Sequence, residues 1–194
     1  MTGQDIGAAL SDTIFYIQMM EKLGPAIWTL DNVSEPHQFF RGKYPTAHVF
    51  SMKQHCRLAQ DRRRMVLSNR TLLLNRTTEV CTVRDVLGKK KGWEADECYW
   101  MRSAWGYARD VDSSKGSYSI TSSHLRAGAS DVGEFGPQHV LTLDDRAMLQ
   151  GCDAPPVWPR KISEGKRRAT VAQVVSPPFA EQLSISVFVI KLQL

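Results

Sequence analysis

Several motifs that identify common enzymes are absent from this chain of 194 residues. It has no Gly-x-Gly triplet, so the glycine-rich turn of a nucleotide-type cofactor site is missing. A Pro-Cys dipeptide, a Gly-x-Ser-x-Gly motif and a P-loop lysine motif are missing too, and no cysteine lies in the context of a nucleophile. These residues therefore supply neither a glycine-rich cofactor-binding turn nor an evident nucleophile.

Cysteine is scarce, and membrane-length apolar runs are missing. The four cysteines form no Cys-x-x-Cys pair and the five histidines have no metal-ligand spacing, so we predict no metal site and no disulfide framework. No run reaches the roughly 18 apolar residues of a membrane span, and charges interrupt the N-terminal segment, which argues against a signal peptide. We expect an intracellular protein, cytoplasmic or nuclear, in a reducing compartment, with no membrane partner.

The charge balance is moderately basic. Lysine and arginine number 25 against 20 acidic residues, for a net charge of +5. This excess favours an anionic partner such as nucleic acid. The length suits one domain, or one domain with a small appendage.

The first part of the chain has the pattern of an α/β sheet. A helix is predicted to begin at Ser11 or Asp12, because apolar residues follow at spacings of three and four, and to stop at Gly24-Pro25. Short apolar runs then predict buried strands at residues 26–30, 48–52 and 65–68. Helices and strands mixed in this way are typical of an α/β fold.

The remaining part is less regular. Residues 89–138 are polar and glycine-rich with little periodicity, which favours a small irregular subdomain or a long functional loop over more sheet. Thr142 has the position of a helix cap, and Pro177-Pro178 that of a helix start. The tail 185–194 fits either a strand or a buried helix.

Two pairs of polar residues are candidate functional residues. Asp31-Asn32 is expected just past a buried strand, a position that faces the ligand crevice of open α/β sheets. The alternative is a simple strand-end cap. Arg62 and Arg64 alternate, so in an extended segment they would point the same way and form a fork for phosphate or a base carbonyl. The alternative is a solvated loop.

Aromatic and basic residues are interleaved after residue 88, and they are candidates for stacking on bases and for contacting phosphates. The alternative is that the tryptophans form a small core of their own. The candidate DNA-binding residues are Lys89, Lys90, Lys91, Trp93, Arg102 and Arg109.

Read in order, several segments resemble motifs in the C-terminal portion of DNA (cytosine-5) methyltransferases. Residues 28–33 are similar to the family's Glu-Asn-Val motif, with Asp31 in place of glutamate, and residues 60–64 match its Gln-x-Arg-x-Arg. Residues 82–88 and 119–121 resemble the entry to and the exit from the target-recognition region. Leu149-Gln150-Gly151 and residues 175–178 are similar to the last two motifs.

The resemblance implies a partial Rossmann-like methyltransferase sheet with a small irregular target-recognition subdomain. Residues 1–88 would belong to the catalytic α/β domain, 89–138 would form a short target-recognition region, and 139–194 would pack back on the catalytic domain. Such a protein transfers a methyl group from S-adenosylmethionine to a cytosine flipped out of double-stranded DNA.

The resemblance also implies roles for individual residues. Asp31 would hydrogen-bond the cytosine edge, and Arg62 and Arg64 would contact the target base and help to order the catalytic loop. Val175, Ser176 and Pro177 would close one side of the cofactor pocket.

The family's glycine-rich cofactor motif and its Pro-Cys nucleophile are not among these residues. One expectation is therefore a split enzyme, inactive alone, in which a complementing chain supplies both motifs and allows S-adenosylmethionine to bind. The alternatives are a degenerate, non-catalytic relative with a DNA-binding or structural role, and an unrelated α/β binding module whose similarity to the family is accidental. An incomplete sheet would expose an edge, which predicts a complementing chain or a homo-oligomer rather than a stable monomer.

Overall fold

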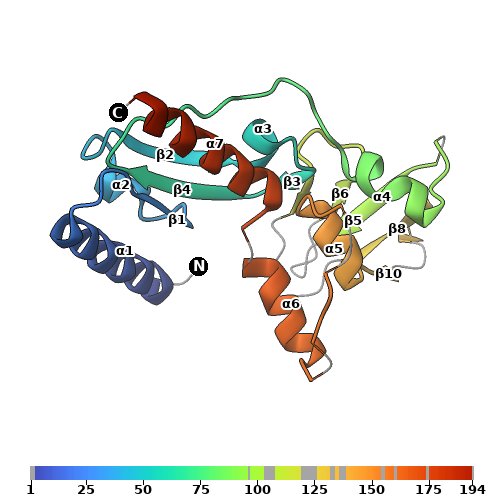
Figure 1. The fold of residues 1–194 in the computed structure, drawn as a ribbon. Helices are drawn as coiled ribbons and strands as arrows, with labels where there is room; N and C mark the ends of the chain where they lie inside the picture. Colours follow the sequence, from blue (N-terminus) through green and yellow to red (C-terminus); the bar gives the residue numbers. More distant parts are fainter. Residues whose placement is uncertain are drawn as a thin grey trace. The chain divides into compact units, whose positions relative to one another are not determined.

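A computed structural model describes residues 3–95, 97–102, 108–118, 126–131, 134–135, 139–153, 156–159, 161–173 and 175–193 (Figure 1). The chain divides into two compact units. Unit 1 comprises Met1–Ser51, Arg63–Asn75 and Glu181–Leu194, and unit 2 comprises Met52–Arg62 and Arg76–Ala180. These divisions fall at other residues than the expected boundaries at 88 and 138.

Unit 1 is built on an antiparallel sheet of three strands in the order β1-β4-β2. The strands are β1 (Thr29–Val33), β4 (Arg63–Ser68) and β2 (Thr46–Ser51). In the register, Asp31 is opposite Val66 and Val33 is opposite Arg64. The helical elements of this part of the chain are α1 (Gly3–Leu23), α2 (His37–Phe40) and the second half of α7 (Pro177–Gln193).

The core of unit 1 lies between α1 and one face of this sheet. Ile17 of α1 packs with Trp28, Met65 and Leu67, all of them buried. Val66 points to the opposite face, because side chains alternate along a strand, and it is fully buried as well. Both faces of the sheet are therefore covered, and the second half of α7 belongs to the same unit (Figure 1).

Unit 2 combines short helices with short strands. Strands β5 (Tyr99–Arg102), β6 (Ala108–Asp110), β8 (Arg126–Asp131), β9 (Glu134–Phe135) and β10 (His139–Val140) form one sheet, and β3 (Gln60–Asp61) pairs in parallel with β7 (Ser117–Tyr118). The helices are α3 (Met52–Cys56), α4 (Val83–Lys91), α5 (Leu143–Leu149) and α6 (Glu164–Gln173). Apolar side chains of these helices and strands form a core around Leu87, Met101 and Leu149.

Several predictions from the sequence are confirmed. Helices and strands are mixed, two predicted strands lie at β2 and β4, and α1 ends at Leu23, after which Gly24 has a left-handed φ of +61°. Thr142 caps α5 through a capping box with Asp145. Helix α7 begins at Pro177 and continues to Gln193, so residues 185–193 of the tail are helical and do not form a strand.

Three predictions about secondary structure are wrong. Helix α1 begins at Gly3 rather than at Ser11 or Asp12, because no helix breaker other than an isolated glycine separates these positions. Asp31 and Asn32 lie within β1 rather than past its end, because pairing with β4 continues to Val33. The expected strand at 26–30 starts three residues later, since an Asn69 side chain binds the backbone N–H of Trp28.

The expectation of an irregular region at 89–138 is also wrong for the part that the structure describes. Strands β5, β6, β8 and β9 lie inside it. Their alternation is too short to stand out in the sequence: in β5, Tyr99 and Met101 are buried and Trp100 between them is half-buried. Residues 119–121, the expected exit from the recognition region, lie outside the described residues.

Two glycines of unit 2 differ in the space around them. Gly92 and Gly116 both have positive φ, +66° and +68°, but a Cβ on Gly92 would meet nothing, whereas one on Gly116 would lie 2.8 Å from the carbonyl carbon of Ala59. We expect Gly92→Ala to cost about 1 kcal/mol of unfolding free energy and Gly116→Ala at least about 3 kcal/mol, because backbone atoms must also move. Urea unfolding of both variants tests this. Equal losses would contradict it.

Candidate functional site

A buried polar cluster in unit 2 joins two segments that are far apart in the sequence. Arg62 Nη1 donates to Gln150 Oε1 at 3.3 Å across 88 positions, and Gln60 Nε2 donates to the backbone carbonyl of Leu149 at 3.2 Å. Gln60 and Gln150 are fully buried and Arg62 is only 9% exposed. We call Gln60, Arg62, Leu149, Gln150 and Gly151 the Gln150 cluster.

The local structure around α5 positions Gln150. The capping box of Thr142 and Asp145 starts the helix, and Gln150 is its C-cap residue. The side-chain amide of Gln150 is hydrogen-bonded through both of its polar atoms. Its Nε2 donates to the carbonyl of Val171 at 3.1 Å, and its Oε1 accepts from Arg62. The amide therefore links α5, α6 and the segment after β3.

Gly151 brings a third segment to the cluster. It has a φ of +82°, and a Cβ there would lie 2.8 Å from Leu58 Cδ2 and 2.9 Å from Pro178 Cδ. Only glycine fits such a close approach without a shift of its neighbours. The Leu-Gln-Gly sequence thus touches both the segment that leads to Gln60 and the start of α7.

Asp145 makes the strongest electrostatic contacts near the cluster. Its fully buried carboxylate lies 2.8 Å from Lys90 Nζ and 2.7 Å from Lys91 Nζ, both on the last turn of α4. Burial alone would raise the pKa of Asp145, but hydrogen bonds from Lys90, Lys91 and Thr142 outweigh it and lower this pKa to about 2. Asp145 therefore fastens α4 to α5 as an ion.

The second candidate pair, Asp31 and Arg64, meets in unit 1. Arg64 Nε lies 2.8 Å from Asp31 Oδ1 and Nη2 lies 2.5 Å from Oδ2, a bidentate pair with both side chains mostly buried. Arg62 and Arg64 thus bond to different partners, Gln150 and Asp31. The two guanidinium groups therefore do not form the single fork that the sequence predicted.

Four of the six candidate DNA-binding residues are engaged inside unit 2. Lys90 and Lys91 pair with Asp145, Trp93 stacks on Tyr99 with ring centroids 5.1 Å apart, and Arg109 Nη1 donates to the carbonyl of Gly116 at 3.1 Å. Trp93 also packs against the core, as the alternative reading of the tryptophans predicted. Lys89 is exposed. The side chain of Arg102 lies outside the described residues.

The three candidate cofactor residues do not form a pocket by themselves. Val175 and Pro177 are exposed, and Ser176 is 2% exposed with its hydroxyl directed at Met52 Sδ, 3.6 Å away. A nucleoside cofactor needs a concave site with several convergent polar groups. Val175, Ser176 and Pro177 alone therefore do not make a site that fits S-adenosylmethionine.

Within the described residues no group of three His, Cys, Asp or Glu side chains is placed to hold a metal ion. All four cysteines are free thiols. Burial raises the pKa of Cys56 to about 12, and it raises those of Cys81 and Cys152 as well, so these three thiols stay protonated at neutral pH.

None of the described helices combines the length and apolarity needed to cross a membrane.

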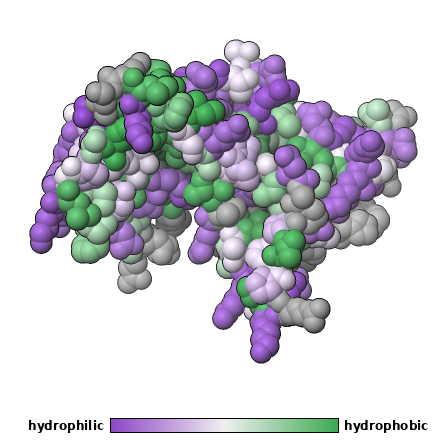
Figure 2. All heavy atoms as spheres, in the orientation of Figure 1, coloured by the Kyte–Doolittle hydropathy of each residue, from purple (hydrophilic) through white to green (hydrophobic). Residues whose placement is uncertain are grey.

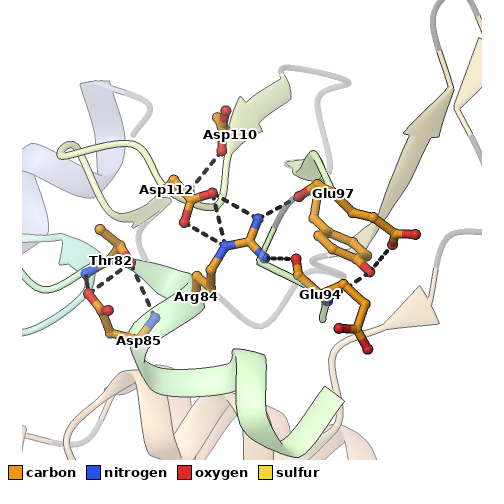
Figure 3. Close-up of polar contacts among 8 residues, drawn as sticks. Thr82, Arg84, Asp85, Glu94, Glu97, Asp110 and Asp112 are labelled. Atoms are coloured by element: carbon orange, nitrogen blue, oxygen red, sulfur yellow. Dashed lines mark hydrogen bonds and ion pairs between the residues drawn. The ribbon is translucent and has the colours of Figure 1, made fainter. Parts of the chain in front are cut away.

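The sequence reasoning missed the residues that organise unit 2. Figure 3 shows the guanidinium of Arg84 bonded to Asp112 and to the carbonyls of Glu94 and Glu97, at 2.6 to 2.9 Å. Arg84 therefore holds the loop after α4 next to β6. An arginine five residues before a lysine run has no sequence signal of its own, whereas the capping pairs Thr82–Asp85 and Thr142–Asp145 do.

Compared with family models and with curated proteins, the chain matches none.

The acid sensitivity of unit 2 is expected to depend on Asp145. Its pKa of about 2 lies below an unfolded value of about 3.9, so ionised Asp145 contributes roughly 2.5 kcal/mol above pH 4, which is lost as the pH falls towards 2. Asp145→Asn should therefore be destabilised at pH 6 and should match the wild type near pH 2, in urea unfolding at each pH. Asp144→Asn is the control. Parallel pH profiles for wild type and Asp145→Asn would contradict this role.

Removal of the Gln150 amide should be costly. Gln150→Met keeps the side-chain length but leaves Arg62 and the Val171 carbonyl without these bonds, which we expect to lower the unfolding free energy by about 2 to 3 kcal/mol. Gln173→Met, at an exposed position of α6, is the matched control and should change little. Equal stability of the two variants in denaturant unfolding would show that the amide does not matter.

Proposed function

We propose that this chain is part of a DNA (cytosine-5) methyltransferase and acts with a complementing polypeptide that supplies the nucleophile and the cofactor loop. The observation that carries the proposal is the Gln150 cluster. Residues 60–64 contribute Gln60 and Arg62 to this cluster, and Leu149-Gln150-Gly151 contributes their partners. Pro178, from the third stretch on which the resemblance rests, lies directly beside Gly151. If these similarities were accidental, segments spread over residues 60–178 would not be expected to lie in contact.

The sheet of unit 1 is a second source of support. Strands β1 and β2 both pair antiparallel with β4, so they run parallel to each other. Large sheets of α/β proteins are often mixed, with antiparallel as well as parallel strands. Such a sheet is compatible with a place in a larger Rossmann-like fold.

In this proposal Asp31 is the residue that faces the cytosine edge. The bidentate pair with Arg64 holds the carboxylate in one orientation. The target base must leave the helix, because the reacting carbon is inaccessible inside the stack. Arg62 acts by position, since its bond to Gln150 holds the segment that leads into Arg64.

A second candidate function is a non-catalytic relative that binds DNA or serves a structural role. It is favoured by one specific observation: both carboxylate oxygens of Asp31 already accept hydrogen bonds from Arg64. A carboxylate that is satisfied in this way has less to offer a base. The two candidates predict different results in one experiment.

The experiment mixes this chain with the candidate complementing polypeptide, one carrying a glycine-rich motif and Pro-Cys, in the presence of tritium-labelled S-adenosylmethionine and double-stranded DNA. We expect label in DNA only when both chains are present. Asp31→Ala should lower the transfer rate by roughly a hundredfold, as is typical for the loss of a group that aids proton transfer or polarisation. Asp153→Ala, at an exposed position, is the control.

Binding to the same DNA is measured alongside as a function of salt. Salt-dependent binding without transfer would select the non-catalytic candidate, because phosphate contacts release counterions. Neither transfer nor binding would overturn both candidates. Lys89→Ala should weaken binding more than Lys90→Ala, since Lys89 is exposed and Lys90 is paired with Asp145.

A further inference from the structure

Helix α1 exposes apolar side chains on the face opposite to its packed face. Ile17 and Thr13 are buried against the sheet, while Phe15, Met19 and Leu23 are 68%, 38% and 70% exposed. Figure 2 shows hydrophobic side chains at the surface over α1, among hydrophilic ones. A row of large apolar side chains on the outer face of a surface helix is typical of a contact surface rather than of a solvated face.

The row continues into two exposed charges at fixed spacing. Asp12, Phe15, Met19 and Lys22 follow one another at intervals of three, four and three residues, which places them in one line along the helix. This is the spacing of the seam between two helices. Neither Asp12 nor Lys22 has a salt-bridge partner in the part of the chain that the structure describes.

We propose that α1 is a dimerisation helix that packs antiparallel against α1 of a second copy of this chain. A two-fold axis midway between Phe15 and Met19, on the exposed face of α1, places Phe15 of one copy opposite Met19 of the other, and Asp12 opposite Lys22. The apolar pair lies at the centre, and an ion pair closes the seam at each end. Thioether sulfur packs favourably against an aromatic ring.

The charges select this partner and this orientation. A parallel pair would put Asp12 beside Asp12 and Lys22 beside Lys22, and like charges at a helix seam repel. In the antiparallel pair, Asp12 of each copy lies opposite Lys22 of the other, so the same ion pair forms twice, as the two-fold symmetry of an isologous interface requires. Helix α7 has a similar exposed apolar row of Ile185, Phe188 and Leu192, with Glu181 one turn before it and Lys191 beside Leu192, so the test compares variants on both helices.

This proposal does not depend on the proposed function. Its test is the self-association of the full chain in sedimentation equilibrium over a range of concentrations, with reductant present because Cys98 is exposed. We expect a dimer. Asp12→Lys alone and Lys22→Asp alone should each weaken association roughly tenfold, because two exposed ion pairs become repulsive. The double variant should associate like the wild type.

A mixture gives the sharpest result. Equimolar Asp12→Lys and Lys22→Asp proteins should form a heterodimer more tightly than either variant associates alone, since every charge then meets its opposite. Phe15→Ser should abolish association, whereas Phe188→Ser on α7 should leave it unchanged. Circular dichroism checks that each variant keeps its helices.

The proposal is overturned if the wild type is monomeric throughout, if the single reversals associate normally, or if the mixture does not recover. Association that is lost in Phe188→Ser and kept in Phe15→Ser would assign the interface to α7 and would also overturn it.

Discussion

The burial of the Arg62 guanidinium is the constraint on which unit 2 depends. A guanidinium stays charged at any physiological pH, so removing it from water requires a fixed acceptor. Gln150 supplies one, and its other end holds the carbonyl of Val171. A neutral amide can do this for two segments at once because it both donates and accepts. Helix α5 must therefore end where it does, and Gly151 must follow it, because only glycine fits between Leu58 and Pro178.

Local signals in the sequence were sufficient for elements whose cause is local. The cap at Thr142, the start of α7 at Pro177 and the end of α1 before Gly24 all depend on residues within one turn. The extent of β1 was misjudged because it depends on pairing with β4, more than 30 positions away. The contact of Asp31 with Arg64 could be expected only once that register was known.

The candidate site was predicted in the same uneven way. Arg62 was a candidate because of its place in Gln-x-Arg-x-Arg, but its partner Gln150, 88 positions later, could not be identified from the sequence. Lys90 and Lys91 look like a DNA-binding run in the sequence, and in the structure they neutralise a buried carboxylate. Charge composition cannot distinguish these roles, because both place lysines at the end of a helix. The difference arises from Asp145, which lies more than 50 positions later and becomes their neighbour only through tertiary packing.

The separation between Arg62 and Gln150 also has a consequence in time. The 88 positions between them correspond to about 4 to 18 s of synthesis at roughly 5 to 20 residues per second. During that interval the Gln150 acceptor is missing, so the segment around β3 lacks the bond that joins the Arg62 guanidinium to α5. Unit 2 can therefore close only after its C-terminal helices have left the ribosome. A nascent chain stalled before residue 150 would remain open there, and accessible to chaperones and proteases.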